Sequence, residues 1–208
     1  MKTSALLLIT LLSFSYTGTE KQEGASQRIA SVANDKDYLL DYFQETTDNL
    51  QESIAGLSKA QMQFKPSADR WSISQCLEHI ILTEKVLFEM TKEQMQKPAN
   101  PERKKELKVK DEELIAGMKD RSSKAKASKE LQGDGRYNDP ETAMKNFIKQ
   151  REEILSYIKS TPVDSMRNHI TDSPFGPIDG DQSCLFIAGH VARHTLQIEE
   201  VKTAADFP

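Results

Sequence analysis

The sequence predicts an all-α fold, an up-down four-helix bundle with a long crossover between its second and third helices. Four segments carry residues at spacings of three and four, the period of an amphipathic helix. No segment shows the alternation of apolar and polar residues that is typical of a half-buried strand, and no repeat is present. A charged stretch of low hydrophobicity at 98–140 separates the second and third helical segments and predicts the crossover.

The first helix is predicted from about Asn34 to Leu57. Asn34 or Asp35 can cap its free backbone N–H groups, and Gly56 marks its end. The connector that follows contains Pro66, which disfavours helix at the preceding residue. The positions that recur at helical spacing are Leu39, Phe43, Thr46, Leu50, Ile54 and Leu57.

The second helix is predicted from Ser72 to about Gln96, where Pro98 follows. Ser72 and Gln75 form a capping-box pattern at its start. Within the crossover, 111–119 predicts a short helix. The apolar stripe of the second helix comprises Ile73, Cys76 or Leu77, Ile80, Leu87 and Met90.

The third helix is predicted from Asp139, its cap, to Thr161, with Pro140 at the first helical position. Its buried side comprises Ala143, Phe147, Ile148, Ile154, Leu155 and Ile158. A loop is predicted at 162–180, and the last helix follows from Asp179 or Asp181 to about Thr203.

Three of the four histidines fit one geometry. His190 and His194 are four residues apart, which places both imidazoles on one face of a helix. That face continues through Ile198 and Val201, so both rings are expected in the apolar seam of the bundle. His79 lies at the edge of the second helix's apolar stripe and reaches the same seam if the two helices are neighbours.

Three such imidazoles predict a metal centre formed by His79, His190 and His194. Neutral imidazole suits divalent zinc, nickel, copper or ferrous iron, and we expect zinc, nickel or iron as the cofactor. Three nitrogen ligands leave a tetrahedral ion one position short, where water or a substrate would bind. The alternative is a core filled by histidines without a metal, because a single histidine on an apolar face is usually a satisfied core residue.

The sequence leaves open the roles of further side chains near this centre. Glu78, Glu84 and Glu199 are either carboxylates that orient the imidazoles or exposed charges on helix faces, the second being favoured. His169 in the Pro/Gly-containing loop is either a pocket residue or fourth ligand, or a solvated loop residue, which is again favoured.

Composition excludes several other classes of protein. With 208 residues and a net charge of −4, the chain has no basic footprint for nucleic acid. Cys76 and Cys184 are the only cysteines and lack CxxC spacing, so they are core residues or one disulfide, with core residues favoured. HExxH, GxSxG, Walker and GxGxxG motifs are absent.

The N-terminus predicts export. Lys2 precedes an apolar run at 5–12, and small residues follow at Ser13 and Ser15, the layout of a secretory signal peptide that is too short for a stable membrane span. We therefore expect a signal peptide at 1–18, a polar linker at 19–33, and the bundle at 34–203. The mature protein would be periplasmic or extracellular.

Two motifs resemble the DinB-like superfamily, and within it the DinB-2 type of domain. They are WSISQCLEHIILTE at 71–84, preceded by the fitting FKPSADRWS, and PFGPIDGDQSCLFIAGHVARHTLQI at 174–198. The resemblance covers about 35–202 and implies a four-helix bundle whose divalent metal is bound by His79, His190 and His194. Characterised relatives include S-transferases and isomerases that use bacillithiol or mycothiol, and they are typically cytoplasmic, unlike the location expected here.

The sequence therefore favours a divalent-metal-dependent enzyme that acts on a small molecule, with transferase or hydrolase chemistry. Either a hydrolase or a thiol S-transferase would use the open position of the metal. The alternative is a non-catalytic metal-binding or interaction bundle, exported from the cell, in which the ion clamps two helices. Helix bundles of this kind often pair, so a homodimer is also open, although no long apolar stripe identifies the interface.

Overall fold

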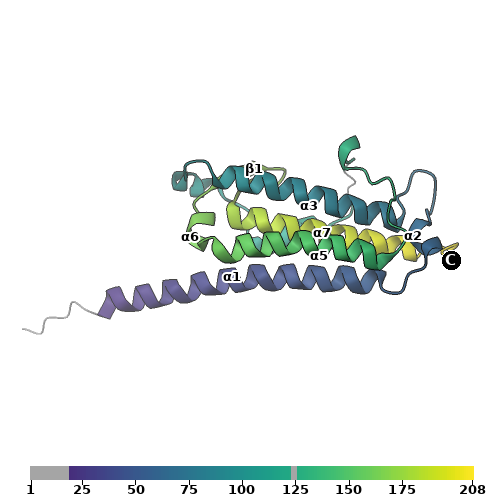
Figure 1. Cartoon of the computed structure of the whole chain (residues 1–208). Coiled ribbons are helices and arrows are strands. Elements are labelled where there is room, and N and C mark those ends of the chain that lie inside the picture. The colour runs from purple at the N-terminus through teal and green to yellow at the C-terminus, as the bar shows by residue number, and fades with distance from the viewer. Residues whose placement is uncertain (1–18, 123–125) are drawn as a thin grey trace, which may run out of the picture.

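The structure is a computed structural model that describes residues 19–122 and 126–208, with side chains in the first helix described from Asp35 onward. The predicted signal peptide at 1–18 lies outside the described residues. Four long helices form the body of the described chain and lie roughly side by side (Figure 1). They are α1 (Thr19–Ile54), α3 (Ile73–Met95), α5 (Pro140–Ser160) and α7 (Gly180–Lys202).

The ends of these helices follow from local capping. The Ser72 hydroxyl accepts a hydrogen bond from the backbone N–H of Gln75, whose side chain accepts one from the backbone of Ser72, so the predicted capping box is confirmed. Asp139 caps α5, and Asp179 caps α7. Gly56, with φ of +69°, takes up a left-handed backbone conformation just after α1 and allows the chain to turn.

The predicted four-helix bundle with a long crossover is confirmed. Consecutive helices do not all alternate in direction, as a simple up-down arrangement would require. α1 and α3 both pack on α7 and on α5. α3 and α5 run in the same direction, because Ile81 contacts Gln150 and Lys92, farther along α3, contacts Glu153, farther along α5. The long segment between α3 and α5 permits this arrangement, since it returns the chain to the end of the bundle where α3 began (Figure 1).

The crossover packs closely against the bundle. It contains η1 (Pro101–Glu106), α4 (Asp111–Lys119) and η2 (Lys129–Leu131), and α4 lies along α7. The predicted short helix at 111–119 is confirmed. A Cβ at Gly189 would lie 3.1 Å from Cβ of Met118, so the glycine beside His190 allows α4 to approach α7 closely.

Four shorter elements occur where the sequence predicted only connectors. These are α2 (Lys59–Gln63), α6 (Val163–Met166) and an antiparallel hairpin of β1 (Ile170–Ser173) and β2 (Gly176–Asp179). The hairpin corrects the expectation that 162–180 is a loop and that no strand forms. Each strand has only four residues, too few for a clear alternation, yet Ile170 and Ile178 are buried.

The segment 19–33, predicted as a linker without periodicity, is helical because α1 begins at Thr19. Its first turns extend beyond the end of the other long helices (Figure 1). The segment is poor in apolar residues, which argued for a linker, but it holds good helix formers and no proline. No helix of the described residues is long and apolar enough to cross a membrane.

Buried polar groups interrupt the apolar core of the bundle. Arg151 of α5 and Glu84 of α3 are almost completely buried and form an ion pair of 2.6 Å. The guanidinium also donates to the carbonyl of Phe43 at 2.8 Å and lies over the rings of Phe43 and Phe147. This pair links α1, α3 and α5 inside the bundle.

Candidate metal centre

α3 and α7 bring three histidines together. His79 extends from α3, whereas His190 and His194 lie one turn apart on α7, and one ring nitrogen of each lies within 4.8 Å of those of the other two. Nε2 of His79 is 3.2 Å from Nε2 of His190. A tetrahedral ion with nitrogen ligands at 2.0–2.1 Å would hold such atoms about 3.3 Å apart, so this pair of nitrogens already has the separation that such an ion needs.

Hydrogen bonds fix which nitrogen of two rings is free. Nδ1 of His79 lies 2.6 Å from the backbone carbonyl of Leu131, which can only accept, so Nδ1 donates and Nε2 keeps its lone pair. Nδ1 of His194 lies 2.8 Å from Oε1 of Gln197, with the same consequence for its Nε2. The acceptors thus prepare two imidazoles as neutral ligands.

The ring of His190 has one polar atom without a hydrogen-bond partner among the described residues. This atom, Nδ1, is buried. Leaving a buried polar atom unpaired costs about 1–3 kcal/mol. The atom of this ring that faces His79 is Nε2, at 3.2 Å, so a metal bound there would leave Nδ1 still without a partner.

Burial keeps the three imidazoles uncharged. It lowers the pKa of His79 and, together with the neighbouring rings, holds the pKa of His194 well below its ordinary 6.5. Burial, then His79 and Arg193, lower the pKa of His190 to about 3. Metal binding requires the neutral form of histidine, so the surroundings favour the state that a metal needs.

Trp71 forms one wall of the cluster. Its ring centroid lies 4.9 Å from that of His79 and 6.2 Å from that of His194, and its indole is stacked on the second ring. The residue directly precedes Ser72, the cap of α3, so the start of the helix sets its position. The indole therefore packs against two of the three imidazoles.

The carboxylates singled out in the sequence lie elsewhere. Glu78 and Glu84 are buried and pair with Arg136 and Arg151, so the prediction of exposed charges was wrong for both. These ion pairs, not the histidines, engage the two carboxylates. Glu199 accepts from Ser53 and pairs with Lys202. These carboxylates stabilise the bundle and the crossover.

His169 and the cysteines are also apart from the cluster. His169 is buried, and its ring nitrogens face the backbone carbonyls of Ser165 and Lys97 at 2.7 and 3.0 Å, so the prediction of a solvated loop residue was wrong. It is not among the clustered ligands. Cys76 and Cys184 are free, buried thiols, as favoured from the sequence.

Gln197 and Leu131 were not foreseen as partners of the histidines. Gln197 follows His194 by three residues, so helical spacing alone could have placed its amide beside the ring. Leu131 contributes a backbone carbonyl, and its side-chain identity gives no signal of that role.

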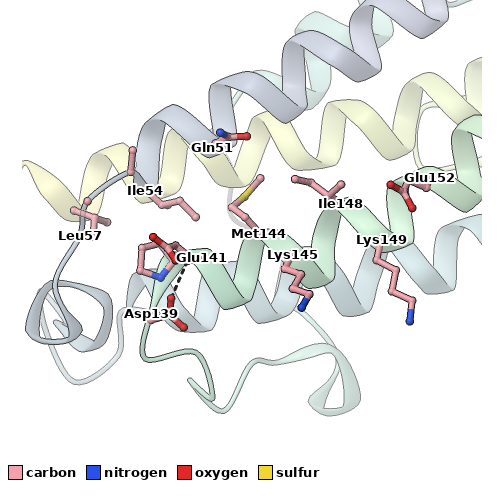
Figure 2. A pocket seen from close by; sticks show the side chains of 13 residues that line it. Gln51, Ile54, Leu57, Asp139, Glu141, Met144, Lys145, Ile148, Lys149 and Glu152 are labelled. Carbon is pink, nitrogen blue, oxygen red and sulfur yellow. Dashed lines mark hydrogen bonds between the residues drawn. The ribbon is translucent and has the colours of Figure 1, made fainter.

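A separate groove lies between α1 and α5 (Figure 2). Ile54, Leu57, Met144 and Ile148 supply its apolar surface, and lysines and glutamates of α5 line its rim. No histidine or cysteine lines it, and its Asp139 serves as the cap of α5. The candidate chemistry therefore resides in the histidine cluster.

Comparison with known families matches residues 42–198 to the DinB superfamily. The chain belongs to the DinB superfamily. Among similar proteins, the uncharacterized protein YuaE of Bacillus subtilis (strain 168) is 27% identical over 162 residues, which span 77% of this chain and 94% of YuaE. The predicted DinB-like family and bundle are thereby confirmed.

A solved structure shares the DinB fold. YfiT from Bacillus subtilis superposes with a TM-score of 0.55 at 11% identity, covering 92% of this chain and 91% of YfiT. YfiT is described as a probable metal-dependent hydrolase with an unusual four-helix bundle topology. At this identity the likeness establishes the fold.

Proposed function

We propose that this DinB protein is a divalent-metal-dependent enzyme that hydrolyses a small molecule. The convergence of His79, His190 and His194 at ligand distance carries the proposal. No fourth histidine, cysteine or carboxylate of the described residues joins the three, which leaves a coordination position for water or substrate. The description of YfiT as a probable metal-dependent hydrolase supports the same chemistry.

Zinc, nickel or ferrous iron suits this set of imidazoles. When bound in an open site, such an ion polarises a carbonyl or phosphoryl oxygen and lowers the pKa of a coordinated water. The residues of the chain orient the ligands: Leu131 holds the ring of His79, and Gln197 holds that of His194. The buried surroundings of the rings strengthen electrostatic interactions at the centre.

A thiol S-transferase is the second chemistry that an open three-histidine site supports, with a substrate thiol in place of water. We place hydrolysis first because we also propose that residues 1–18 direct export, and low-molecular-weight thiols are scarce outside the cell. The apolar run at 5–12 supports export. The substrate is proposed to be a small molecule, and self-association into a homodimer is compatible with the proposal.

Elemental analysis of the purified protein tests the metal centre. We expect about one divalent ion per chain in the wild type and loss of that ion in His190→Ala. His169→Gln is the matched control, because it removes a buried histidine outside the cluster. Equal metal content in His190→Ala and wild type would contradict the site.

Measurement of substrate turnover distinguishes an enzyme from a non-catalytic bundle in which the metal only links two helices. The loaded protein would be assayed on esters, amides, phosphoesters and thiol acceptors, each with and without prior removal of the metal. Metal-dependent hydrolysis of one class supports the proposal, and turnover only with thiols favours the transferase. A metal that raises the melting temperature without turnover of any class would establish the non-catalytic alternative.

A further inference from the structure

The ring of His194 is held by an amide that is itself held from the crossover. Oε1 of Gln197 lies 2.8 Å from Nδ1 of His194. Nη1 of Arg121, which follows α4 in the crossover, lies 3.4 Å from the same oxygen. Two side chains from segments far apart in the sequence therefore converge on one acceptor.

This convergence decides the orientation of the amide. A glutamine side chain presents an oxygen that accepts and an NH2 group that donates, whereas a guanidinium only donates. Arg121 therefore requires the oxygen of Gln197 on its side, and the same oxygen then faces His194. Nδ1 of His194 must be the donor, which leaves the lone pair on its Nε2.

Arg121 has a fixed position of its own. Its Nε and Nη2 donate to the two carboxylate oxygens of Glu200 at 2.6 and 2.9 Å, a bidentate arrangement. Glu200 also pairs with Arg70 at 3.2 Å. The order of contacts runs from Glu200 through Arg121 and Gln197 to His194, and it joins the crossover to α7.

We propose that Gln197 is a positioning residue for the metal ligand His194, and that Arg121 sets the orientation of the Gln197 amide. The inference rests on the proposed metal site and deepens it. Hydrogen-bond partners of ligating histidines fix the tautomer and the direction of the ring, and their removal typically weakens metal binding about 10–100-fold. Arg121 acts one contact farther away, so its loss is expected to weaken binding by about 3–10-fold, less than the loss of Gln197.

Intrinsic tryptophan fluorescence gives a direct readout of metal binding. The chain contains a single tryptophan, Trp71, and its ring is 4.9 Å from that of His79. Ni²⁺ or Co²⁺ bound at the cluster would quench this emission at short range. Titration with Ni²⁺ after chelator treatment therefore measures affinity without any assay of activity.

The decisive comparison is between Gln197→Ala, Gln197→Met and Gln197→Glu. The first two remove the acceptor, the second while keeping most of the side-chain length, and should bind Ni²⁺ about 10–100-fold more weakly than wild type. Gln197→Glu retains an acceptor and pairs with Arg121, so it should restore or exceed wild-type affinity. Rescue by glutamate distinguishes positioning from a merely structural role.

Gln94→Ala is the control, because that amide donates to the carbonyl of Ile170 and not to the cluster. Its Ni²⁺ affinity should match wild type. Wild-type affinity in both Gln197→Ala and Gln197→Met would overturn the inference while leaving the metal site intact. Absence of Ni²⁺ binding by the wild type would overturn the metal site and this inference with it.

Discussion

The Nε2 atoms of His79 and His190 lie 3.2 Å apart although 111 positions separate the two residues in the chain. Nε2 of His79 carries a lone pair, because Nδ1 of the same ring donates to Leu131. A metal between the two rings would tie α3 to α7. The free energy of metal binding would then add to the free energy of unfolding of the bundle.

We therefore expect Zn²⁺ to stabilise the folded protein. At a free concentration one hundred times the dissociation constant, the free energy of unfolding should rise by about 2.7 kcal/mol. Urea denaturation with and without Zn²⁺ measures the gain. It should vanish in His79→Ala, and a gain of equal size in that variant would show that Zn²⁺ binds elsewhere.

The sequence was sufficient to find the histidines but not their partners. The spacing of His190 and His194 places both rings on one face whatever the surroundings. The approach of His79 depends on the packing of α3 against α7, which no local pattern encodes. The carbonyl of Leu131 could not be foreseen, because every residue has one and only the fold of the crossover brings this one to the ring.

Substitution of Gly133 tests the contact between the crossover and α3. A Cβ at this position would lie 2.4 Å from the backbone oxygen of Gln75, so Gly133→Ala must push the crossover outward and disturb the nearby carbonyl of Leu131. We expect a loss of about 1–3 kcal/mol in stability and weaker quenching of Trp71 by Ni²⁺. Denaturation and the fluorescence titration measure the two effects.

Gly117→Ala is the matched control. The nearest atoms that a Cβ there would meet belong to the ring of Phe175, a side chain that can shift, and alanine favours the helix of α4. Its metal affinity should equal that of wild type. If Gly133→Ala binds Ni²⁺ as tightly as the control, the crossover does not support the ligands.

The fold was predictable where local signals are strong. Ser72 and Asp139 are side-chain caps next to periodic segments, and the helices they begin agree with the predicted ones to within a residue. The shared direction of α3 and α5 was not predictable, because the crossover is long enough to return the chain to either end. The linker predicted at 19–33 followed from the low hydrophobicity of that segment. The structure has helix there, because α1 begins at Thr19.

Asp181 predicts an unusual dependence of stability on pH. Burial raises its pKa to about 7 against the opposing charge of Arg167, and its Oδ1 has no hydrogen-bond partner among the described residues. In the unfolded chain its pKa is about 3.9, so between pH 4 and 7 the folded state holds the proton more tightly. Its contribution to stability is therefore present at low pH and is lost as the pH rises to about 7.

Asp181→Asn should remove this loss. We expect the variant to be about 1–3 kcal/mol more stable than wild type at pH 8 and nearly equal to it at pH 4, because Arg167 keeps Asp111 and Asp179 as partners. Asp35→Asn, which alters an exposed partner of Arg167, is the control and should change little. Parallel stability curves for Asp181→Asn and wild type from pH 4 to 8 would contradict this account.

The ion pair of Glu84 and Arg151 gives the last prediction. Both side chains are buried, and Arg151 also donates to Phe43 and Thr46 of α1. Arg151→Met fills similar volume but leaves a buried carboxylate without its cation, which typically costs about 3–5 kcal/mol. The double variant Glu84→Gln with Arg151→Met removes the stranded charge and should recover much of that loss. Urea denaturation of the three proteins measures the coupling, and equal losses in single and double variants would show that the hydrogen bonds to α1, and not the ion pair, dominate.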